Sequence, residues 1–434
     1  MKRWPKSLPD YRWPPHLMSV WMMPLRWILA SIFHVSYALG LLASLMPSGR
    51  VRVLVIRTDG LGDGLLFEPA LENLARVLSP RVIHLWVPHL TRDLFRHCPT
   101  IARMMVIPRG FKSGNLRYFL SPILRARLGF ALGRWTFDKV IYPVESPEPL
   151  GNWLFASARA VERWLNSGDT ANQFDWQQAR IHEVATKIIE TRPGNAHELL
   201  RNEYLTEQWS GERTLRQPKV HLADGMKARA EAQVDLWRAA AKKRGGEEVI
   251  GIVPAASMPI KAYPDARWAA ALKRLWEQQR AMPVLLGGPT DGASLDSLAS
   301  ALVAAEVPHQ RLVAPLDILE MAAIVAELDG VLSVDTGLAH LSVAQGVPTV
   351  VLVTGGNPGR FFPWPNARSH VVLNVPMSCS GCNDRCTLSE AECITHIPSD
   401  DIVAAYARLK GRRVSLDVMI APQQKPKKPL QQAG

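Results

Sequence analysis

The sequence has no signature of nucleic-acid binding, although its charge alone would suggest one. Of its 434 residues, 51 are Lys or Arg and only 39 are Asp or Glu, which gives a net charge of +12. No zinc-finger or RNP-type motif accompanies this excess, so nucleic acid is not an expected partner. The basic residues are spread along the chain, often beside aromatic residues, which suits anionic membranes or phosphorylated ligands.

Cysteine is scarce, and four of the five cysteines lie within 379–393. No Ala-x-Ala-like cleavage site follows the N-terminal apolar stretch, so a cleavable signal peptide is not expected. Both features indicate a reducing compartment, where clustered cysteines are more often metal ligands or free thiols than disulfides.

The clustered cysteines leave three alternatives open. They are Cys379, Cys382, Cys386 and Cys393. Four thiolates could hold a structural zinc ion in a tetrahedron, although the spacing is less regular than in paired Cys-x-x-Cys knuckles. Plain free thiols are the second alternative, and an iron–sulfur cluster is the third.

One long uncharged run occurs near the N-terminus. Residues 27–46 carry no formal charge at neutral pH and just reach the roughly 20 residues that a spanning helix needs. Basic residues flank the run on both sides, so the orientation of a spanning helix would be poorly defined. A helix lying in the membrane interface, with Trp4, Trp13, Trp21 and Trp27 at headgroup level, avoids this difficulty. The alternative without a membrane is a buried helix.

Apolar, β-branched runs alternate with helical segments from residue 51 onward, which predicts α/β domains with parallel sheets covered by helices. The expected strands are 51–56, 82–87, 104–107 and 139–142, then 249–253, 284–286, 330–334 and 349–353. We therefore predict two Rossmann-like domains, 51–225 and 249–415. They would be joined by a charged helical connection, 226–248. A membrane-associated segment, 1–50, precedes them, and a disordered basic tail, 416–434, follows.

A Gly/Asp turn follows the first expected strand, with the sequence Thr58-Asp59-Gly60-Leu61-Gly62-Asp63-Gly64. It is not a dinucleotide-binding G-x-G-x-x-G motif, because Leu65 stands where the third glycine would be. A helix that follows directly would point free N–H groups at a ligand. Asp63, at the mouth of the strand, could accept a proton from an attacking hydroxyl. The alternative is a turn with a structural role only.

Two further motifs follow strands of the second domain. Ser257 and Lys261 could donate hydrogen bonds to one diphosphate, or Lys261 could simply be a solvated loop residue. In Asp335-Thr336-Gly337-Leu338-Ala339-His340, the backbone of Thr336 and Gly337 would donate N–H groups at a helix start. If Asp335 or Thr336 only capped that helix, His340 one turn further on would be unexplained.

Basic and aromatic residues alternate between 109 and 135. The basic ones are Arg109, Lys112, Arg117, Arg125, Arg127 and Arg134, and the aromatic ones are Phe111, Tyr118, Phe119, Phe130 and Trp135. One interpretation is a solvated basic face of a helix. The other is contact with anionic lipid, in which arginines supply charge and aromatic rings enter the interface.

Three of these motifs, taken in order, resemble glycosyltransferase family 9, the heptosyltransferases of lipopolysaccharide core assembly. They are the stretches 57–63, 261–268 and 335–340, and the Gly-Gly-Pro turn at 287–289 also fits. The resemblance covers roughly residues 51–410. Residues 354–365 follow the family's corresponding loop only loosely.

The resemblance implies a GT-B fold, in which two Rossmann-like domains face each other across a cleft, and inverting sugar transfer without a required metal. It implies Asp63 as the base that deprotonates the acceptor hydroxyl, with Arg57, Gly62 and Gly64 near the acceptor or a phosphate. For the donor it implies Ser257 and Lys261 on the diphosphate, and Asp335, Thr336, Gly337 and His340 around the nucleotide-sugar.

We therefore expect an enzyme that moves a heptose-like sugar from an ADP-heptose-like donor to a lipopolysaccharide-core or other lipid-linked or oligosaccharide acceptor. The expected location is the cytoplasmic face of the bacterial inner membrane. One alternative is a GT-B-type nucleotide-sugar epimerase or hydrolase. The other is a non-catalytic membrane scaffold, against which the presence of Asp63, Lys261 and Asp335 argues.

Overall fold

The computed structural model describes residues 23–45, 53–78, 83–107, 121–190, 196–211, 216–256, 258–313 and 317–411. Ser257, the segment 108–120, the N-terminal residues 1–22 and the tail from 412 lie outside these ranges. The predictions made for those residues therefore stay predictions.

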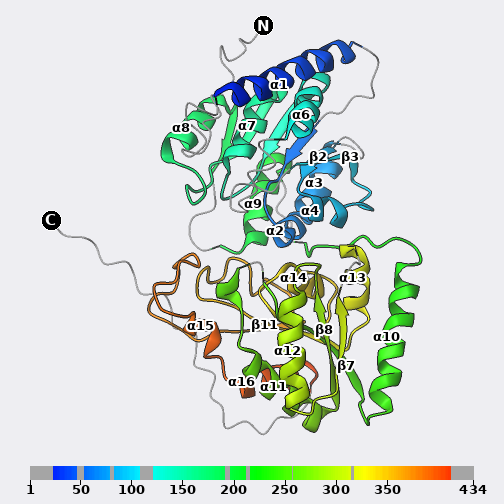
Figure 1. Ribbon diagram of the computed structural model, residues 1–434. Coiled ribbons are helices and arrows are strands. Elements are labelled where there is room, and N and C mark those ends of the chain that lie inside the picture. Colours follow the sequence, from blue (N-terminus) through cyan, green and yellow to red (C-terminus); the bar gives the residue numbers. More distant parts are fainter. Residues whose placement is uncertain are drawn as a thin grey trace, which may run out of the picture.

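The first domain is built on six parallel strands in the order β3-β2-β1-β4-β5-β6 (Figure 1). The strands are β1 Val53–Ile56, β2 Ile83–Val87, β3 Ile101–Val106, β4 Thr136–Tyr142, β5 Arg159–Asn166 and β6 Lys187–Ile189. Its helices are α2 Leu61–Leu66, α3 Glu68–Leu78, α4 His89–Leu94, α6 Pro122–Arg134, α7 Pro149–Ser157, α8 Asp175–Val184 and α9 Glu198–Ser210. Every residue of β1 is apolar and buried, as expected for a parallel strand covered on both faces.

The second domain has the same plan, with six parallel strands in the order β12-β11-β10-β7-β8-β9. The strands are β7 Glu248–Val253, β8 Ala281–Gly287, β9 Gln310–Val313, β10 Gly330–Val334, β11 Thr349–Leu352 and β12 His370–Leu373. The helices are α10 Met226–Lys242, α11 Asp265–Gln279, α12 Gly292–Ala304, α13 Ile318–Ala326, α14 Gly337–Ala344, α15 Glu392–Thr395 and α16 Ser399–Leu409, with a 3-10 turn, η4 Pro259–Lys261.

The α/β architecture predicted from the sequence is confirmed, but four strands were not anticipated. They are β5, β6, β9 and β12, which are short or carry many polar residues. The sequence also predicts one helix over 65–78 after β1. The helical segment instead begins at Leu61 and is interrupted at Phe67. The interruption follows from Pro69, which has no N–H to donate to the preceding turn.

The chain passes from the first domain to the second through residues 216–225 and then forms α10, which packs against β7 and α13. The predicted connecting helix, α10, therefore packs on the second domain. Helix α9 of the first domain packs on α2 and α3 and also reaches the second domain. At the start of α9, the Glu198 N–H donates to the Arg360 carbonyl of the second domain at 2.8 Å. In Figure 1, α2 and α9 face α13 and α14 across the boundary.

The N-terminal helix, α1 Met23–Ala43, packs along α6. Leu29 and Phe33 are almost completely buried. A Cβ atom added to Gly129 or Gly133 of α6 would lie 2.5 Å or 2.1 Å from a backbone oxygen of α1. These two glycines therefore allow the helix backbones to touch. One face of α1 fits the buried-helix alternative.

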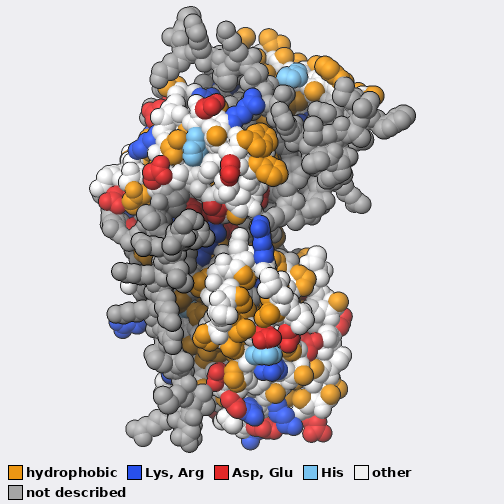
Figure 2. Space-filling view, turned by 90° about the vertical axis from the view of Figure 1, so that its left-hand side faces the viewer, with side chains coloured by type: hydrophobic (Ala, Val, Ile, Leu, Met, Phe, Trp, Pro, Cys, Tyr) orange, Lys and Arg blue, Asp and Glu red, His pale blue; other side chains and the backbone are white. Residues whose placement is uncertain are grey.

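The opposite face of α1 is exposed and apolar. Trp27 is 70% exposed, and Ile28, Val35, Leu39 and Leu42 are also exposed. Figure 2 shows hydrophobic side chains gathered at the end of the molecule where α1 lies. Of the helices in the described ranges, none combines the length and the apolarity needed to cross a bilayer.

We predict that Phe33→Ala destabilises the protein by about 3–5 kcal/mol, because it leaves a cavity between α1 and α6. The free energy of unfolding in urea measures this effect. Val35→Ala on the same helix is the control, since Val35 is 61% exposed. Equal stability of the two variants would show that α1 is not packed on the first domain.

Candidate active site

Helices α2 and α14 touch across the domain boundary, and two glycines make this approach possible. A Cβ atom on Gly62 would lie 2.7 Å from the His340 ring, and one on Gly337 would lie 2.6 Å from the Leu61 side chain. The Gly/Asp turn of the first domain is thereby placed against the Asp-Thr-Gly motif of the second. The fold therefore brings these two motifs together at the domain boundary.

Asp63 lies in the first turn of α2, where the Gly60 N–H donates to its Oδ2 at 3.3 Å. Its pKa is raised to about 7, first by burial and then by repulsion from the carboxylates of Asp59 and Glu198. Arg57 and Arg360 oppose this shift without cancelling it. A carboxyl group with a pKa near neutrality can take up and release a proton under physiological conditions.

Arg57 lies behind the loop that carries Asp63. Its side chain is 1% exposed, its Nε donates to Asp59 Oδ1 at 3.0 Å, and its guanidinium stands 4.3 Å from the centroid of the Phe67 ring. These contacts hold Asp59 in place beside Asp63. They give Arg57 a supporting position, whereas its suggested contact with an acceptor or phosphate stays a prediction.

Gly64 is fully buried within α2 and faces α4. A Cβ atom there would lie 2.5 Å from the Thr91 side chain. Its role in this structure is close packing of two helices, and contact with an acceptor or phosphate stays a prediction for Gly64 as well.

The second wall of the site carries a partly buried ion pair. The Lys261 Nζ, in η4, donates to Asp335 Oδ2 at 2.7 Å and lies 3.9 Å from Asp384 Oδ2. Burial alone would lower the pKa of Lys261, but attraction to Asp335 and Asp384 outweighs it and raises that pKa. The ammonium group is therefore charged and held at the carboxyl end of β10.

His340 is buried and neutral. Burial lowers the pKa of this ring to about 3. Its Nδ1 accepts a hydrogen bond from the Trp364 indole at 3.1 Å, which assigns the ring hydrogen to Nε2. Nε2 lies 3.8 Å from Asp335 Oδ1, and the ring stacks on Phe362 with centroids 4.3 Å apart. The ring of His340 is thus held by Trp364 and Phe362, with its Nε2 on the side of Asp335.

The capping alternative for the Asp-Thr-Gly motif does not describe what the side chains do. Thr336 stands at the N-cap of α14 but forms no side-chain capping bond. Asp335 is engaged with Lys261 instead. The first turn of α14 therefore begins, at Gly337, without a side-chain cap and faces the other domain, a position that favours an anion.

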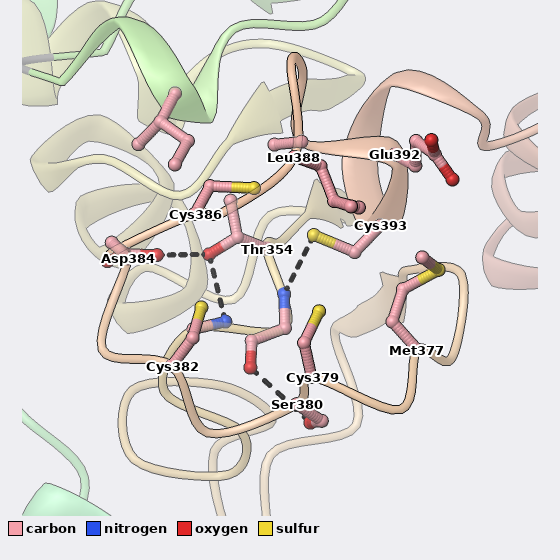
Figure 3. Close-up of a pocket in the computed structure, with 14 residues that line it drawn as sticks. Thr354, Met377, Cys379, Ser380, Cys382, Asp384, Cys386, Leu388, Glu392 and Cys393 are labelled. Atoms are coloured by element: carbon pink, nitrogen blue, oxygen red, sulfur yellow. Dashed lines mark hydrogen bonds between the residues drawn. The ribbon is translucent and has the colours of Figure 1, made fainter.

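Asp384 was not predicted as a site residue, yet it organises one side of the site. Its Oδ1 accepts from the Thr354 hydroxyl at 2.6 Å, and its Oδ2 accepts from Asn357 at 3.3 Å and lies near Lys261. Asp384 lies between Cys382 and Cys386, and Figure 3 shows it pointing at Thr354. The surrounding cysteines are a pattern typical of metal binding, so the sequence gives no separate signal for Asp384.

Glu198 and Arg360 were also missed. Arg360 belongs to the loosely matched loop 354–365, and its Nε lies 3.6 Å from Glu198 Oε2. This contact joins the start of α9 to the second domain next to Asp63. The polar sequence around Glu198 has no motif, so only the tertiary structure reveals the pair.

None of the four clustered cysteines forms a disulfide, and together they line a small pocket (Figure 3). The Gly355 N–H donates to Cys393 Sγ at 3.3 Å. In the part of the chain that the structure describes, however, only one group of three or more metal-ligating atoms lies within 4.8 Å of one another. That group is Glu68, Cys98 and His221. The four sulfurs surround a pocket but are not drawn together at ligand spacing.

Comparison with known proteins agrees with this geometry. The model of glycosyltransferase family 9 (heptosyltransferase) matches residues 172–391. Lipopolysaccharide heptosyltransferase 1 of Escherichia coli is 24% identical over 313 residues, which are 71% of this chain and 89% of that protein. Its namesake from Pseudomonas aeruginosa is 31% identical over 133 residues. That match covers 36% of the Pseudomonas protein and 30% of this chain.

Solved structures show the same fold. A family 9 glycosyltransferase from Veillonella parvula has a TM-score of 0.64 at 17% identity, covering 84% of this chain and 98% of its own. The E. coli heptosyltransferase WaaC with ADP has a TM-score of 0.60 at 17% identity, covering 82% and 99%. The two facing α/β domains therefore have the GT-B arrangement. The chain belongs to glycosyltransferase family 9, the heptosyltransferases, as its three motifs suggested.

Proposed function

We propose that this chain is an inverting glycosyltransferase that moves a heptose-like sugar from an ADP-heptose-like donor to an acceptor hydroxyl. The observation that carries the proposal is Asp63, whose pKa is raised to about 7, in a helix that touches α14 of the other domain. A base on one wall and the charged ammonium group of Lys261 on the other are what a single displacement between two substrates requires.

In the proposed reaction the acceptor hydroxyl loses its proton to the Asp63 carboxylate. The acceptor oxygen forms a bond to the anomeric carbon while the bond from that carbon to the diphosphate oxygen breaks. Attack and departure occur on opposite faces, so the configuration inverts. The leaving diphosphate carries away the electron pair, and Lys261 and the start of α14 stabilise its negative charge. No step calls for a metal ion.

The donor is proposed from the chemistry of the site and from relatives. One solved E. coli heptosyltransferase contains ADP and another contains ADP-2-deoxy-2-fluoro heptose. In this chain Lys261 is charged and partly buried, so it suits a diphosphate. Ser257, Thr336, Gly337 and His340 keep their proposed places around the nucleotide-sugar.

The acceptor is proposed to be the lipopolysaccharide core or another lipid-linked saccharide at the cytoplasmic face of the bacterial inner membrane. The exposed apolar face of α1 supports contact with a membrane. Beside it, α6 exposes Ile123, Arg127 and Phe130. A combination of apolar and basic side chains on adjacent helices suits the interface of an anionic bilayer.

The cysteine pocket is proposed to hold a structural zinc ion, with free thiols as the alternative. Zinc accepts four thiolates in a tetrahedron. Burial raises the pKa of the Cys393 thiol, and the Gly355 N–H that donates to its Sγ opposes that shift. Binding would require the sulfurs around the pocket to converge, and Gly381, whose φ is 93°, lies in the segment that would move.

We predict that Asp63→Asn lowers kcat by about 10²–10⁴-fold and leaves the affinity for ADP largely unchanged. In the parent, kcat/KM should fall as the pH drops through about 7, because protonation removes the base. This limb of the pH profile should be absent from the residual activity of the variant. Near-parental turnover of Asp63→Asn would remove Asp63 from the proposed mechanism.

We predict that Lys261→Ala weakens binding of both the sugar donor and ADP, since both carry the diphosphate. A tenfold or larger rise in the Kd of ADP, measured by calorimetry, is the expected result, which corresponds to about 1.4 kcal/mol. Lys273→Ala, at an exposed position of α11, is the matched control. Unchanged ADP affinity would move Lys261 off the phosphate site.

For the cysteine pocket, we predict that Cys382→Ser lowers the zinc content by one ion per chain relative to the parent. Elemental analysis of protein purified without chelator measures this. Ser389→Ala, an exposed change in the same segment, should leave the zinc content unaltered. Equal zinc in parent and Cys382→Ser would return these residues to free thiols.

For the membrane, we predict co-sedimentation of the full chain with anionic phosphatidylglycerol vesicles. Replacing three exposed residues of α1 by serine, Val35, Leu39 and Leu42, should lower the partition coefficient by about tenfold or more, since apolar area is lost. The control replaces three equally exposed residues elsewhere, Val161, Leu236 and Val303. If both triple variants bound vesicles as the parent does, this face of α1 would not be a membrane surface.

A further inference from the structure

A second group of metal-ligating side chains lies away from the catalytic residues and the cysteine pocket. Glu68 begins α3, Cys98 follows α4, and His221 belongs to the segment 216–225 that leads to the second domain. One ligand atom from each lies within 4.8 Å of the other two. The His221 Nε2 and Glu68 Oε1 are 3.0 Å apart.

The burial of this group sets it apart from surface carboxylates. The Glu68 side chain is 1% exposed, Cys98 is 6% exposed, and the His221 side chain is 23% exposed. A thiol, an imidazole and a carboxylate are the three ligand types that zinc takes. Ligand bonds of about 2.0–2.3 Å place neighbouring ligand atoms about 3–4 Å apart. Glu68 and His221 are 3.0 Å apart, and the other two pairs of ligand atoms lie within 4.8 Å.

We propose that Glu68, Cys98 and His221 form a binding site for a divalent zinc-type metal ion. The Glu68 Oε2 accepts from the Lys219 N–H at 3.0 Å, and this bond would orient the carboxylate while its other oxygen binds the ion. Three protein ligands leave a fourth position for water. Solvent can reach this position because the His221 side chain is partly exposed.

The position of the site gives the ion a structural consequence. It would fasten the segment between the domains to the start of α3, directly after the helix that carries Asp63. Two residues before Cys98, the Arg96 guanidinium meets Asp317 of the second domain at 2.7 Å. A metal ion here would therefore stiffen the junction on which the placement of the two domains depends.

Without a metal ion the His221 side chain is hydrogen-bonded to Glu68. Hydrogen bonds to Cys98 and Glu68 raise the pKa of His221 to about 10. A metal ion has to displace protons from His221 and Cys98, as ligand deprotonation requires. A proton-bridged cluster that never takes metal is thus the competing state.

Cobalt(II) distinguishes the two states, because a thiolate bound to Co²⁺ gives a charge-transfer absorption band. The experiment titrates Co²⁺ into metal-free, reduced full-length protein in which the four cysteines of the C-terminal pocket are serine. The expected result is one Co²⁺ per chain with a thiolate band. Cys98→Ser should remove the band, and Glu68→Gln or His221→Gln should weaken binding at least tenfold. Glu72→Gln, one turn along α3, is the matched control and should bind as the background does.

A second measurement serves if the four-serine background does not fold. In the parent sequence, Cys98→Ser should reduce bound Co²⁺ by one per chain, and saturating Zn²⁺ should raise Tm more in the parent than in His221→Gln. No loss of Co²⁺ with Cys98→Ser, or Zn²⁺ shifts that are equal in the parent and His221→Gln, would overturn the proposal and leave a proton-bridged cluster.

Discussion

The close contact between α2 and α14 determines how the site is assembled. Gly62 lies against the His340 ring and Gly337 against Leu61, so neither position has space for a side chain. Because the two helices begin at the carboxyl ends of β1 and β10, their contact brings together the edges of two sheets where ligands of such folds bind. Asp63 and the Lys261–Asp335 pair reach a common site only through this contact.

Asp63 suits proton transfer because of its raised pKa, but the same shift makes folding less favourable. The pKa of Asp63 is about 7 in the folded protein and about 3.9 in an unfolded chain. The native state therefore binds the proton more tightly, and this group makes folding less favourable as the pH rises from about 4 to 7. Asp59 and Glu198 raise the pKa of Asp63 further and so increase this unfavourable free energy, whereas Arg57 and Arg360 lower that pKa and reduce it. A carboxyl group kept near neutrality is characteristic of a functional site.

Central buried strands and the three motifs could be predicted from the sequence, because continuous apolar runs and glycine-rich turns are local signals. The polar strand β5 and the short edge strand β6 could not, since their pairing is decided by neighbours. Asp384, Glu198 and Arg360 have no motif and reach the site only through the tertiary fold. The apolar run at the N-terminus showed a helix, but only the glycines of α6 reveal that one face of α1 is packed. Ser257 stays a prediction from the sequence.

The central claim is that Asp63 is a carboxyl group that ionises near neutral pH at the domain boundary. The most direct measurement is a pH titration of protein labelled with ¹³C at the aspartate side-chain carboxyl, followed by NMR and assigned by comparison with Asp63→Asn. The expected result is one resonance with a midpoint near pH 7 that is absent from the variant and shifts when ADP binds. A midpoint near 4, the ordinary value for an exposed aspartate, would contradict the proposed role of Asp63 as the base.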